Sequence, residues 1–248
     1  MTDGILINPQ SEPGDPRLPS NGFFNILPSQ ARQADQWLSQ LGGKPKFLFN
    51  SHLRLLTEKD SPNPFFVAGP AVGAPMAVMT LEKLIALGAT KVIVYGWCGS
   101  LHPELKTGDI LLPTTALSEE GTSSHYPGHG QDLGSSPKLR EKLVNLLYRE
   151  GWTPREGRIW TTDAPYRETR DKVNRYTAQG ILAVDMEFSA ITTVARFRNI
   201  ELAAVMLVSD ELWRTTWQPG YKNKNFIRKD KTLISLLLEH NPILFKNE

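Results

Sequence analysis

The sequence has little of several features that mark special classes of protein. Cys98 is the only cysteine among 248 residues, which excludes an intrachain disulfide and a cysteine-based zinc cluster. The formal net charge is +2, from 28 basic and 26 acidic side chains, so no nucleic-acid partner is expected. No apolar run approaches the roughly 18 residues that a membrane span needs. The composition therefore predicts a globular protein with no membrane partner.

The amino-terminal region also lacks clear patterns. Residues 1–4 have no basic segment followed by an apolar one, so we expect no signal peptide and a cytoplasmic location. Residues 1–22 are rich in proline and glycine and show little periodicity, which predicts an extended arm on the surface or on a neighbouring subunit. Because no internal repeat is visible, we expect a single domain over residues 1–248 that includes this arm.

Apolar strands alternate with amphipathic helices along the chain. This alternation predicts an α/β sandwich with a mostly parallel sheet. Residues 52–64 carry Arg54 and are expected to be a linker, and Ser29 is expected to cap the first helix. Helices are predicted over residues 29–41, 74–87, 137–150, 171–179, 188–197 and 229–240, and strands over 46–50, 65–68, 92–94, 108–113, 157–163, 181–184 and 202–208.

The most informative stretch is KVIVYGWCGSL, residues 91–101. Val92, Ile93 and Val94 form a β-branched run without polar alternation, as in a strand that is buried on both faces. Gly96 and Gly99 then predict a tight turn that a ligand can approach closely. Because ligands gather at the carboxyl ends of parallel strands, this turn is a candidate binding region.

Three carboxylates follow apolar strands: Asp185, Glu187 and Asp210. Ionised acids are costly to bury unless they are paired, so their positions need an explanation. Asp185 fits a structural role in the first turn of a helix. Glu187 and Asp210 are better candidates for binding hydroxyls or moving a proton. A polar cluster at residues 119–126 is either a second part of the site or a solvated loop.

Five short motifs together resemble the nucleoside phosphorylase family, which includes purine nucleoside phosphorylases, uridine phosphorylases and nucleosidases. They are GPAVGAP at residues 69–75, GWCG at 96–99, GD at 108–109, VDME at 184–187 and SD at 209–210. The resemblance covers roughly residues 45 to 215. It implies a three-layer α/β/α sandwich on a mixed, barrel-like sheet, in homodimers or trimers of dimers. It also implies cleavage of an N-ribosidic bond, with phosphate as co-substrate and with no cofactor or metal.

The resemblance also implies roles for individual residues at the sugar. Met186 would pack against the ribose, and Glu187 would hold its 2′ and 3′ hydroxyls. Cys98 and Gly99 would line the pocket for base and sugar.

Other residues would contact the base. Trp160 falls where the family has an aromatic side chain that stacks on it. Asp210 would bond a purine at N7 and help to protonate the leaving base, a step that makes departure easier. Tyr166, Arg167 and Glu168 could bind a base edge. The Asp210 motif favours a purine, whereas residues 120–126 resemble the corresponding loop of uridine phosphorylases. The sequence therefore does not decide between a purine and a pyrimidine base.

The phosphate ligands of the family are missing from their usual positions. Val94 and Trp97 stand where phosphorylases carry an arginine and a serine or threonine, and neither can hold a dianion in the same way. Arg17, Arg54 and Arg214 are candidate replacements, and Arg167 or Arg170 could also reach the site. Arg54 lies in the segment before the glycine loop, which is the GPAVGAP motif at residues 69–75. The resemblance implies that Arg54 would reach the site of a partner subunit.

Three functions remain open from the sequence. The leading hypothesis is phosphorolysis of a nucleoside, which gives a free base and ribose 1-phosphate. The second is hydrolysis by a nucleosidase, which Val94 and Trp97 favour. The third is a non-catalytic nucleoside-binding protein.

Overall fold

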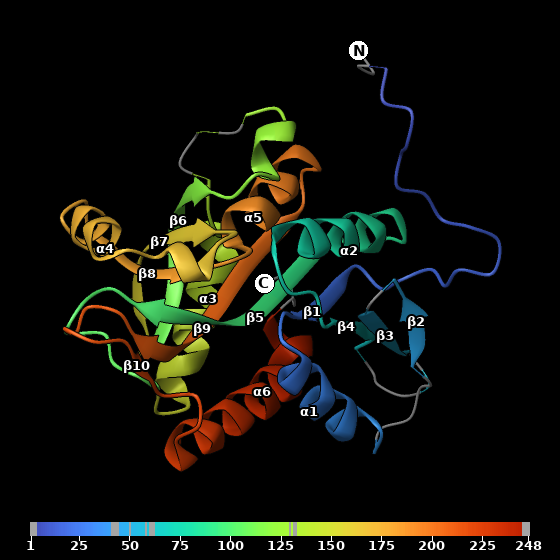
Figure 1. Ribbon diagram of the computed structural model, residues 1–248. Coiled ribbons are helices and arrows are strands. Elements are labelled where there is room, and N and C mark those ends of the chain that lie inside the picture. The colour runs from blue at the N-terminus through green and yellow to red at the C-terminus, as the bar shows by residue number, and fades with distance from the viewer. Residues whose placement is uncertain are drawn as a thin grey trace.

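The structure is a computed structural model, and it describes residues 4–40, 45–49, 51–57, 59, 63–128, 130 and 133–244. Within these residues the strands form a single mixed sheet, with helices on both of its faces (Figure 1). No helix in the described ranges is long and apolar enough to cross a membrane.

Five strands close into a barrel-like ring. Around the ring, β9 pairs with β6, β6 with β7, β7 with β8, β8 with β5, and β5 again with β9. The β5–β9 and β6–β7–β8 pairings are parallel, whereas β5–β8 and β6–β9 are antiparallel. The ring strands are β5 (Lys91–Ser100), β6 (Ile110–Glu119), β7 (Arg155–Thr162), β8 (Ile181–Asp185) and β9 (Glu201–Glu211).

The sheet continues outward from β5 through four further strands in the order β1, β4, β3 and β2, and β10 extends it beyond β9. β1 lies parallel between β5 and β4. These strands are β1 (Asn21–Asn25), β2 (Lys46–Leu48), β3 (Ser51–Leu56), β4 (Phe65–Gly69) and β10 (Gln218–Pro219).

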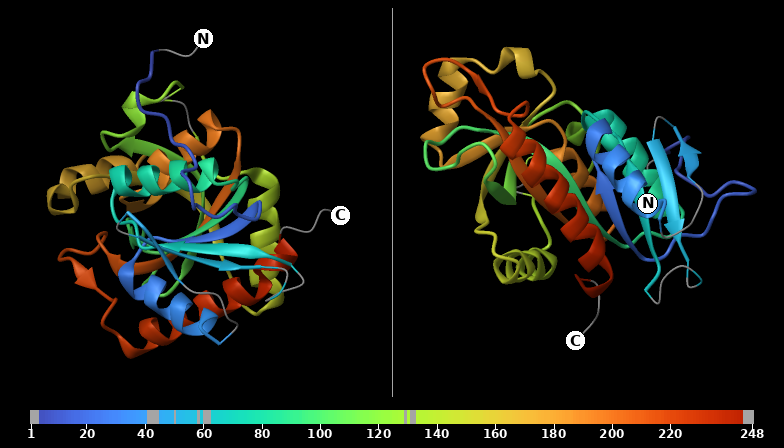
Figure 2. Two further views of the ribbon diagram at one scale, coloured as in Figure 1. Left: turned by 90° about the vertical axis from the view of Figure 1, so that its right-hand side faces the viewer. Right: turned by 90° about the horizontal axis from the view of Figure 1, so that it is seen from below.

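The helices form two layers, one on each side of the sheet (Figure 2). α2 and α5 pack together on one face, and α1, α3 and α6 cover the other, each layer burying its own apolar cluster. α4 packs outside β7 and β8. The sandwich and its barrel-like sheet are thereby confirmed. The helices are α1 (Pro28–Leu38), α2 (Ala74–Ala86), α3 (Pro137–Arg149), α4 (Arg170–Thr177), α5 (Phe188–Phe197) and α6 (Lys224–Leu244).

The predicted glycine turn is wrong, because β5 runs straight through it to Ser100. The glycines make room for neighbours instead. A Cβ at Gly96 would lie 3.1 Å from the Met206 sulfur, and one at Gly99 would lie 2.5 Å from Leu212 Cδ1. The β5–β9 register shifts between Cys98 and Gly99, so this part of the ring is a bulge rather than a turn.

The amino-terminal third differs most from the prediction. The expected arm ends in β1, an interior strand, and the expected linker contains β3. α1 begins at Pro28, with Leu27 as its N-cap, so Ser29 is not the cap. Proline is well suited to the first helical position, where its missing N–H costs nothing. The predicted strand end at Asn50 and helix end at Leu41 lie outside the described residues.

Asp230 connects α6 to the sheet. Its side chain is buried and accepts hydrogen bonds from the Tyr95 hydroxyl and the Trp97 indole, each at 2.8 Å, and from the Gln33 amide at 3.2 Å. The three donors belong to β5 and α1, so this carboxylate joins three elements and fixes the orientation of the Trp97 ring.

We expect Asp230→Ala to lower the free energy of unfolding by about 3 kcal/mol, because it leaves buried donors without an acceptor. Urea unfolding measures the change. Glu239→Ala is the matched control: Glu239 is exposed on the same helix, so its loss is expected to stay within about 0.5 kcal/mol. Equal unfolding midpoints for the two variants would contradict the role of Asp230.

Candidate active site

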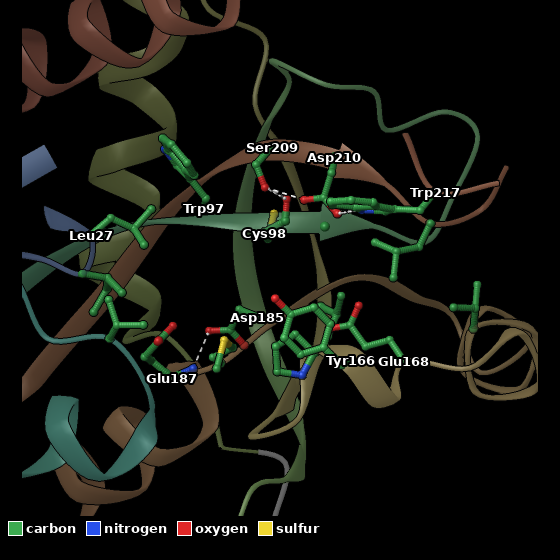
Figure 3. A pocket seen from close by; sticks show the side chains of 18 of the residues that line it. Leu27, Trp97, Cys98, Tyr166, Glu168, Asp185, Glu187, Ser209, Asp210 and Trp217 are labelled. Atoms are coloured by element: carbon green, nitrogen blue, oxygen red, sulfur yellow. Dashed lines mark hydrogen bonds between the residues drawn. The ribbon is translucent and has the colours of Figure 1, made fainter. Parts of the chain in front are cut away.

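A cavity of about 440 Å³ opens where β5, β8 and β9 end. Its wall combines the motif residues with several that belong to loops (Figure 3). Leu27, Trp97 and Glu187 lie on one side, whereas Tyr166, Glu168 and Asp210 lie on the other. The lining comprises Ile26, Leu27, Val72, Trp97, Cys98, Gly99, Pro165, Tyr166, Glu168, Arg170, Val173, Val184, Asp185, Met186, Glu187, Ser209, Asp210, Leu212 and Trp217.

The glycine loop, residues 69–75, holds the Glu187 side chain at one end of the cavity. The backbone N–H of Gly73, at the start of α2, donates to Glu187 Oε1 at 2.5 Å. Gly73 has φ +87°, a conformation that favours glycine. Burial, and then the charge of Asp185, raise the pKa of Glu187 to about 8. The N–H groups at a helix N-terminus can bind an external anion, but here one of them is already bonded to a carboxyl of the protein itself.

Asp185 has a structural role at the start of α5, as expected. Its Oδ2 accepts the backbone N–H groups of Glu187 at 3.1 Å and Phe188 at 2.7 Å, and its Oδ1 accepts the Thr161 hydroxyl at 2.6 Å. Burial raises the pKa of Asp185 against these hydrogen bonds, which lower it. Asp185 thus orders the turn that presents Met186 and Glu187 to the cavity.

Asp210 lies at the other end of the cavity, in β9. Its Oδ1 accepts the Ser209 hydroxyl at 2.5 Å, and its Oδ2 accepts the Trp217 indole N–H at 2.7 Å. A Cβ at Gly99 would lie 3.2 Å from Asp210 Oδ2, so the neighbouring strand must be bare there. Both oxygens of Asp210 therefore point to fixed positions beside the cavity.

Two further side chains border this end. The Tyr166 side chain is fully exposed and lies at the mouth. Glu168 is half-buried behind it, and burial, followed by the charge of Asp210, raises its pKa to about 8, although Lys172 opposes the effect. Two carboxyl groups with different surroundings thus face the same space (Figure 3).

The wall beside Glu187 is apolar. Ile26, Leu27 and Val72 contribute aliphatic side chains, and the only N–H of the Trp97 ring is bonded to Asp230 rather than to the cavity. Arg170 is the one lysine or arginine in the lining given by the described residues, and its guanidinium donates to the carbonyl oxygens of Leu212, at 2.8 Å, and Arg214.

The cavity brings together eight of the thirteen candidate residues from the sequence: Cys98, Gly99, Tyr166, Glu168, Arg170, Met186, Glu187 and Asp210. Trp160 is not among them, and its expected stacking on a base is wrong. The ring is fully buried beneath α4, with its centroid 4.8 Å from that of Tyr176. Tyr166 is the aromatic side chain that borders the cavity instead.

Of the candidate anion ligands, Arg170 alone belongs to the cavity lining given by the described residues. Arg54 is buried in β3, pairs with Asp35 of α1 at 2.5 Å and does not line this cavity, and its expected role in a partner's site stays a prediction. Arg214 donates to Glu211 at 2.6 Å. Arg17 lies in the amino-terminal arm, and Arg167 also lies outside the lining.

The polar cluster at residues 119–126 is a structural loop rather than part of the lining. Glu120 accepts hydrogen bonds from the hydroxyls of Ser118 and Ser189 and from the backbone N–H groups of Thr122 and Ser123. These bonds attach the loop to α5. The functional interpretation of this cluster is not supported by its position.

The sequence did not identify Trp217 or Leu27 as parts of the site, whereas Arg170 was among the arginines expected to reach it. Trp217 lies in the loop before β10, and no local pattern connects it to Asp210. Cys98 lines the cavity, but burial and the charges of Asp185 and Asp210 raise the pKa of its thiol well above the ordinary value, so it is unsuited to act as a nucleophile. No group of three or more potential metal ligands occurs in the part of the chain that the structure describes.

The raised pKa of Glu187 predicts a pH-dependent stability. The ordinary value is 4.5, so the folded state binds this proton more tightly than the unfolded chain. That stabilisation is complete below about pH 4.5 and is lost as the pH rises through about 8. We expect Glu187→Gln to lose less stability than the wild type between about pH 5 and about pH 9 in urea unfolding. Parallel pH profiles would contradict the assignment.

Comparisons with known proteins agree with this architecture. A sequence model of the phosphorylase superfamily matches residues 31–238. The DeoD-type purine nucleoside phosphorylases of Bacillus cereus and Bacillus thuringiensis are each 28% identical over 149 residues, or 59% of this chain. The match spans 63% of the length of either relative.

Solved structures show the same fold at lower identity. Purine nucleoside phosphorylase from Toxoplasma gondii, in complex with immucillin-H, is 19% identical, with a TM-score of 0.80 over 92% of both chains. Uridine phosphorylase from Vibrio fischeri ES114 is also 19% identical, with a TM-score of 0.71 over 92% of this chain and 90% of that one. The match over most of its length shows that the chain belongs to the phosphorylase superfamily.

Proposed function

We propose that this protein cleaves the N-glycosidic bond of a nucleoside. The observation that carries the proposal is the arrangement of carboxyl groups in one cavity, with Glu187 at one end and Glu168 and Asp210 at the other. A carboxylate accepts hydrogen bonds from two neighbouring hydroxyls of a sugar, and acids near a heterocycle can neutralise its charge as it leaves. A nucleoside presents both parts. The relatives' printed names support a purine as the base.

We further propose water as the acceptor of the sugar. A phosphate dianion needs cationic or N–H donors, because transfer to an apolar wall leaves its charge uncompensated. The wall beside Glu187 is formed by Ile26, Leu27, Val72 and Trp97, and the Gly73 N–H is already bonded to Glu187. Water carries no charge, so this wall does not oppose its binding.

Phosphorolysis is the second candidate, because relatives that match the chain are named phosphorylases. It would require cations from outside the described lining. A second copy of the chain could supply them, in keeping with the dimer or trimer of dimers that the family resemblance implies. Val72 and Trp217, together with Tyr166, give the mouth of the cavity exposed apolar surface for such a contact.

The acceptor is tested by incubating inosine, adenosine and uridine with the wild-type protein, with and without phosphate. We expect the base to be released at the same rate in both conditions, with ribose as the sugar product. The reason is that no described group in the cavity wall beside Glu187 compensates the charge of a phosphate dianion. Chromatography measures the base, and phosphorus NMR detects any ribose 1-phosphate.

Base release that requires phosphate, with ribose 1-phosphate as product, would overturn water as the acceptor and establish phosphorolysis. Tight nucleoside binding without base release under either condition would overturn both and leave the non-catalytic binding protein.

Glu187→Gln tests the sugar end. Replacing the carboxyl weakens a hydrogen bond from the sugar diol, so we expect kcat/KM for a riboside to fall about 10- to 100-fold. A 2′-deoxyriboside lacks one of the hydroxyls and should lose markedly less. Steady-state kinetics on the matched pair of substrates measures the difference. An equal loss for both would place Glu187 away from the 2′ and 3′ hydroxyls.

A further inference from the structure

Glu168 is a carboxyl group for which the fold provides no partner. It follows the short 3₁₀ turn Pro165–Arg167 and lines the cavity on the same side as Asp210 and Trp217 (Figure 3). Among the described residues, no hydrogen bond or ion pair reaches its side chain, although the group is half-buried. A polar group in this situation is expected to bond a ligand, because an unmet hydrogen bond is costly at a partly buried site.

Asp210, which borders the same end of the cavity, is in the opposite situation. Its Oδ2 accepts the Trp217 indole N–H, and its Oδ1 contacts the Ser209 hydroxyl, which also lies 3.2 Å from the Cys98 carbonyl oxygen. Both oxygens of Asp210 therefore already have partners in the protein. Glu168, whose oxygens have none among the described residues, is better placed to turn an O–H toward a leaving base.

The charges around Glu168 favour its protonated form. Asp210 in β9 is the negative charge that raises its pKa, to about 8 together with burial. Lys172 of α4 acts in the opposite direction, but its ammonium is bonded to Glu119 of β6 at 2.8 Å. Arg170 donates to backbone carbonyl oxygens, and the remaining acids of the cavity, Asp185 and Glu187, belong to the sugar end.

We propose that Glu168 donates the proton that the base takes up as the glycosidic bond breaks, a proposal that rests on the proposed function. The electron pair of the C1′–N bond passes to the base, and the proton moves from the Glu168 carboxyl to a ring nitrogen. The oxygen of a water molecule forms the new bond to C1′. The proton that this water loses restores Glu168 through solvent, so atoms and charges balance over one turnover.

The test compares two leaving groups in Glu168→Gln. A purine needs a proton to leave, whereas 4-nitrophenolate leaves as a stable anion. We expect kcat for inosine and adenosine to fall roughly 10²- to 10⁴-fold, the range for a lost general acid. Hydrolysis of 4-nitrophenyl β-ribofuranoside should stay within about threefold of the wild type, because that step needs no acid. Glu141→Gln, at an exposed position on α3, is the matched control and should leave both rates unchanged.

The pH profile gives a second readout. If the protonated form of Glu168 is active, wild-type kcat for nucleosides is constant at lower pH and falls as the pH rises through about 8. Glu187, whose pKa is also raised to about 8, is still present in Glu168→Gln, so the part of the alkaline limb that Glu168 causes is the difference between the two profiles, and the limb should be smaller in the variant. Glu168→Asp keeps an acid at the position and should recover part of the lost nucleoside activity.

Three results would overturn the proposal. The first is a nucleoside kcat in Glu168→Gln within about threefold of wild type. The second is an equal loss for the nucleosides and the nitrophenyl riboside, which would indicate a structural role. In both cases the wild type still cleaves nucleosides, so the proposed function stands. The third is a wild type that releases no base from any nucleoside, which refutes the proposed function and this proposal together.

Discussion

The parallel pairing of β5 with β9 is the constraint on which the rest of the site depends. It runs from Lys91 opposite Glu201 to Ser100 opposite Glu211, and it closes the ring of five strands. Its register shift at Cys98 and Gly99 places a bare glycine opposite Asp210. A side chain at position 99 would fill the space between Leu212 and the Asp210 carboxyl. Both the closure of the barrel and the opening beside Asp210 therefore follow from one strand pair.

The cavity then concentrates acidic groups in surroundings that treat them differently. Asp185 is bonded to backbone N–H groups and serves α5, whereas Glu187 is bonded to the glycine loop and faces the cavity. Asp210 is held by two donors, and Glu168 by none among the described residues. Surroundings that push the pKa values of neighbouring acids apart are a common way to give these acids separate tasks in catalysis. Here the Asp185 carboxyl supports the fold. The proposed function gives Glu187 to the sugar, and Glu168 and Asp210 to the base.

Much of this arrangement could be predicted from the sequence, because it depends on local patterns. The apolar runs before Asp185 and Asp210 identified strands that carry acids at their carboxyl ends, and Glu187 and Asp210 do meet in one cavity. The failures involve long-range packing. Trp160 is aromatic and close to the site in sequence, but α4 covers the face of β7 that carries it. Arg54 looked free in an expected linker, yet β3 buries it against α1.

The contact between Trp97 and Asp230 limits which residues can replace Trp97 in evolution. A serine or threonine at position 97, as phosphorylases carry, would remove one of three donors from a buried carboxylate and leave a void where the indole packs against Phe226. Residues that share such a contact do not change independently. Replacement of Trp97 by such a residue would thus require a coordinated change in α6 as well as in β5. The identity of this cavity residue is consequently protected against single mutations by a helix that does not line the cavity.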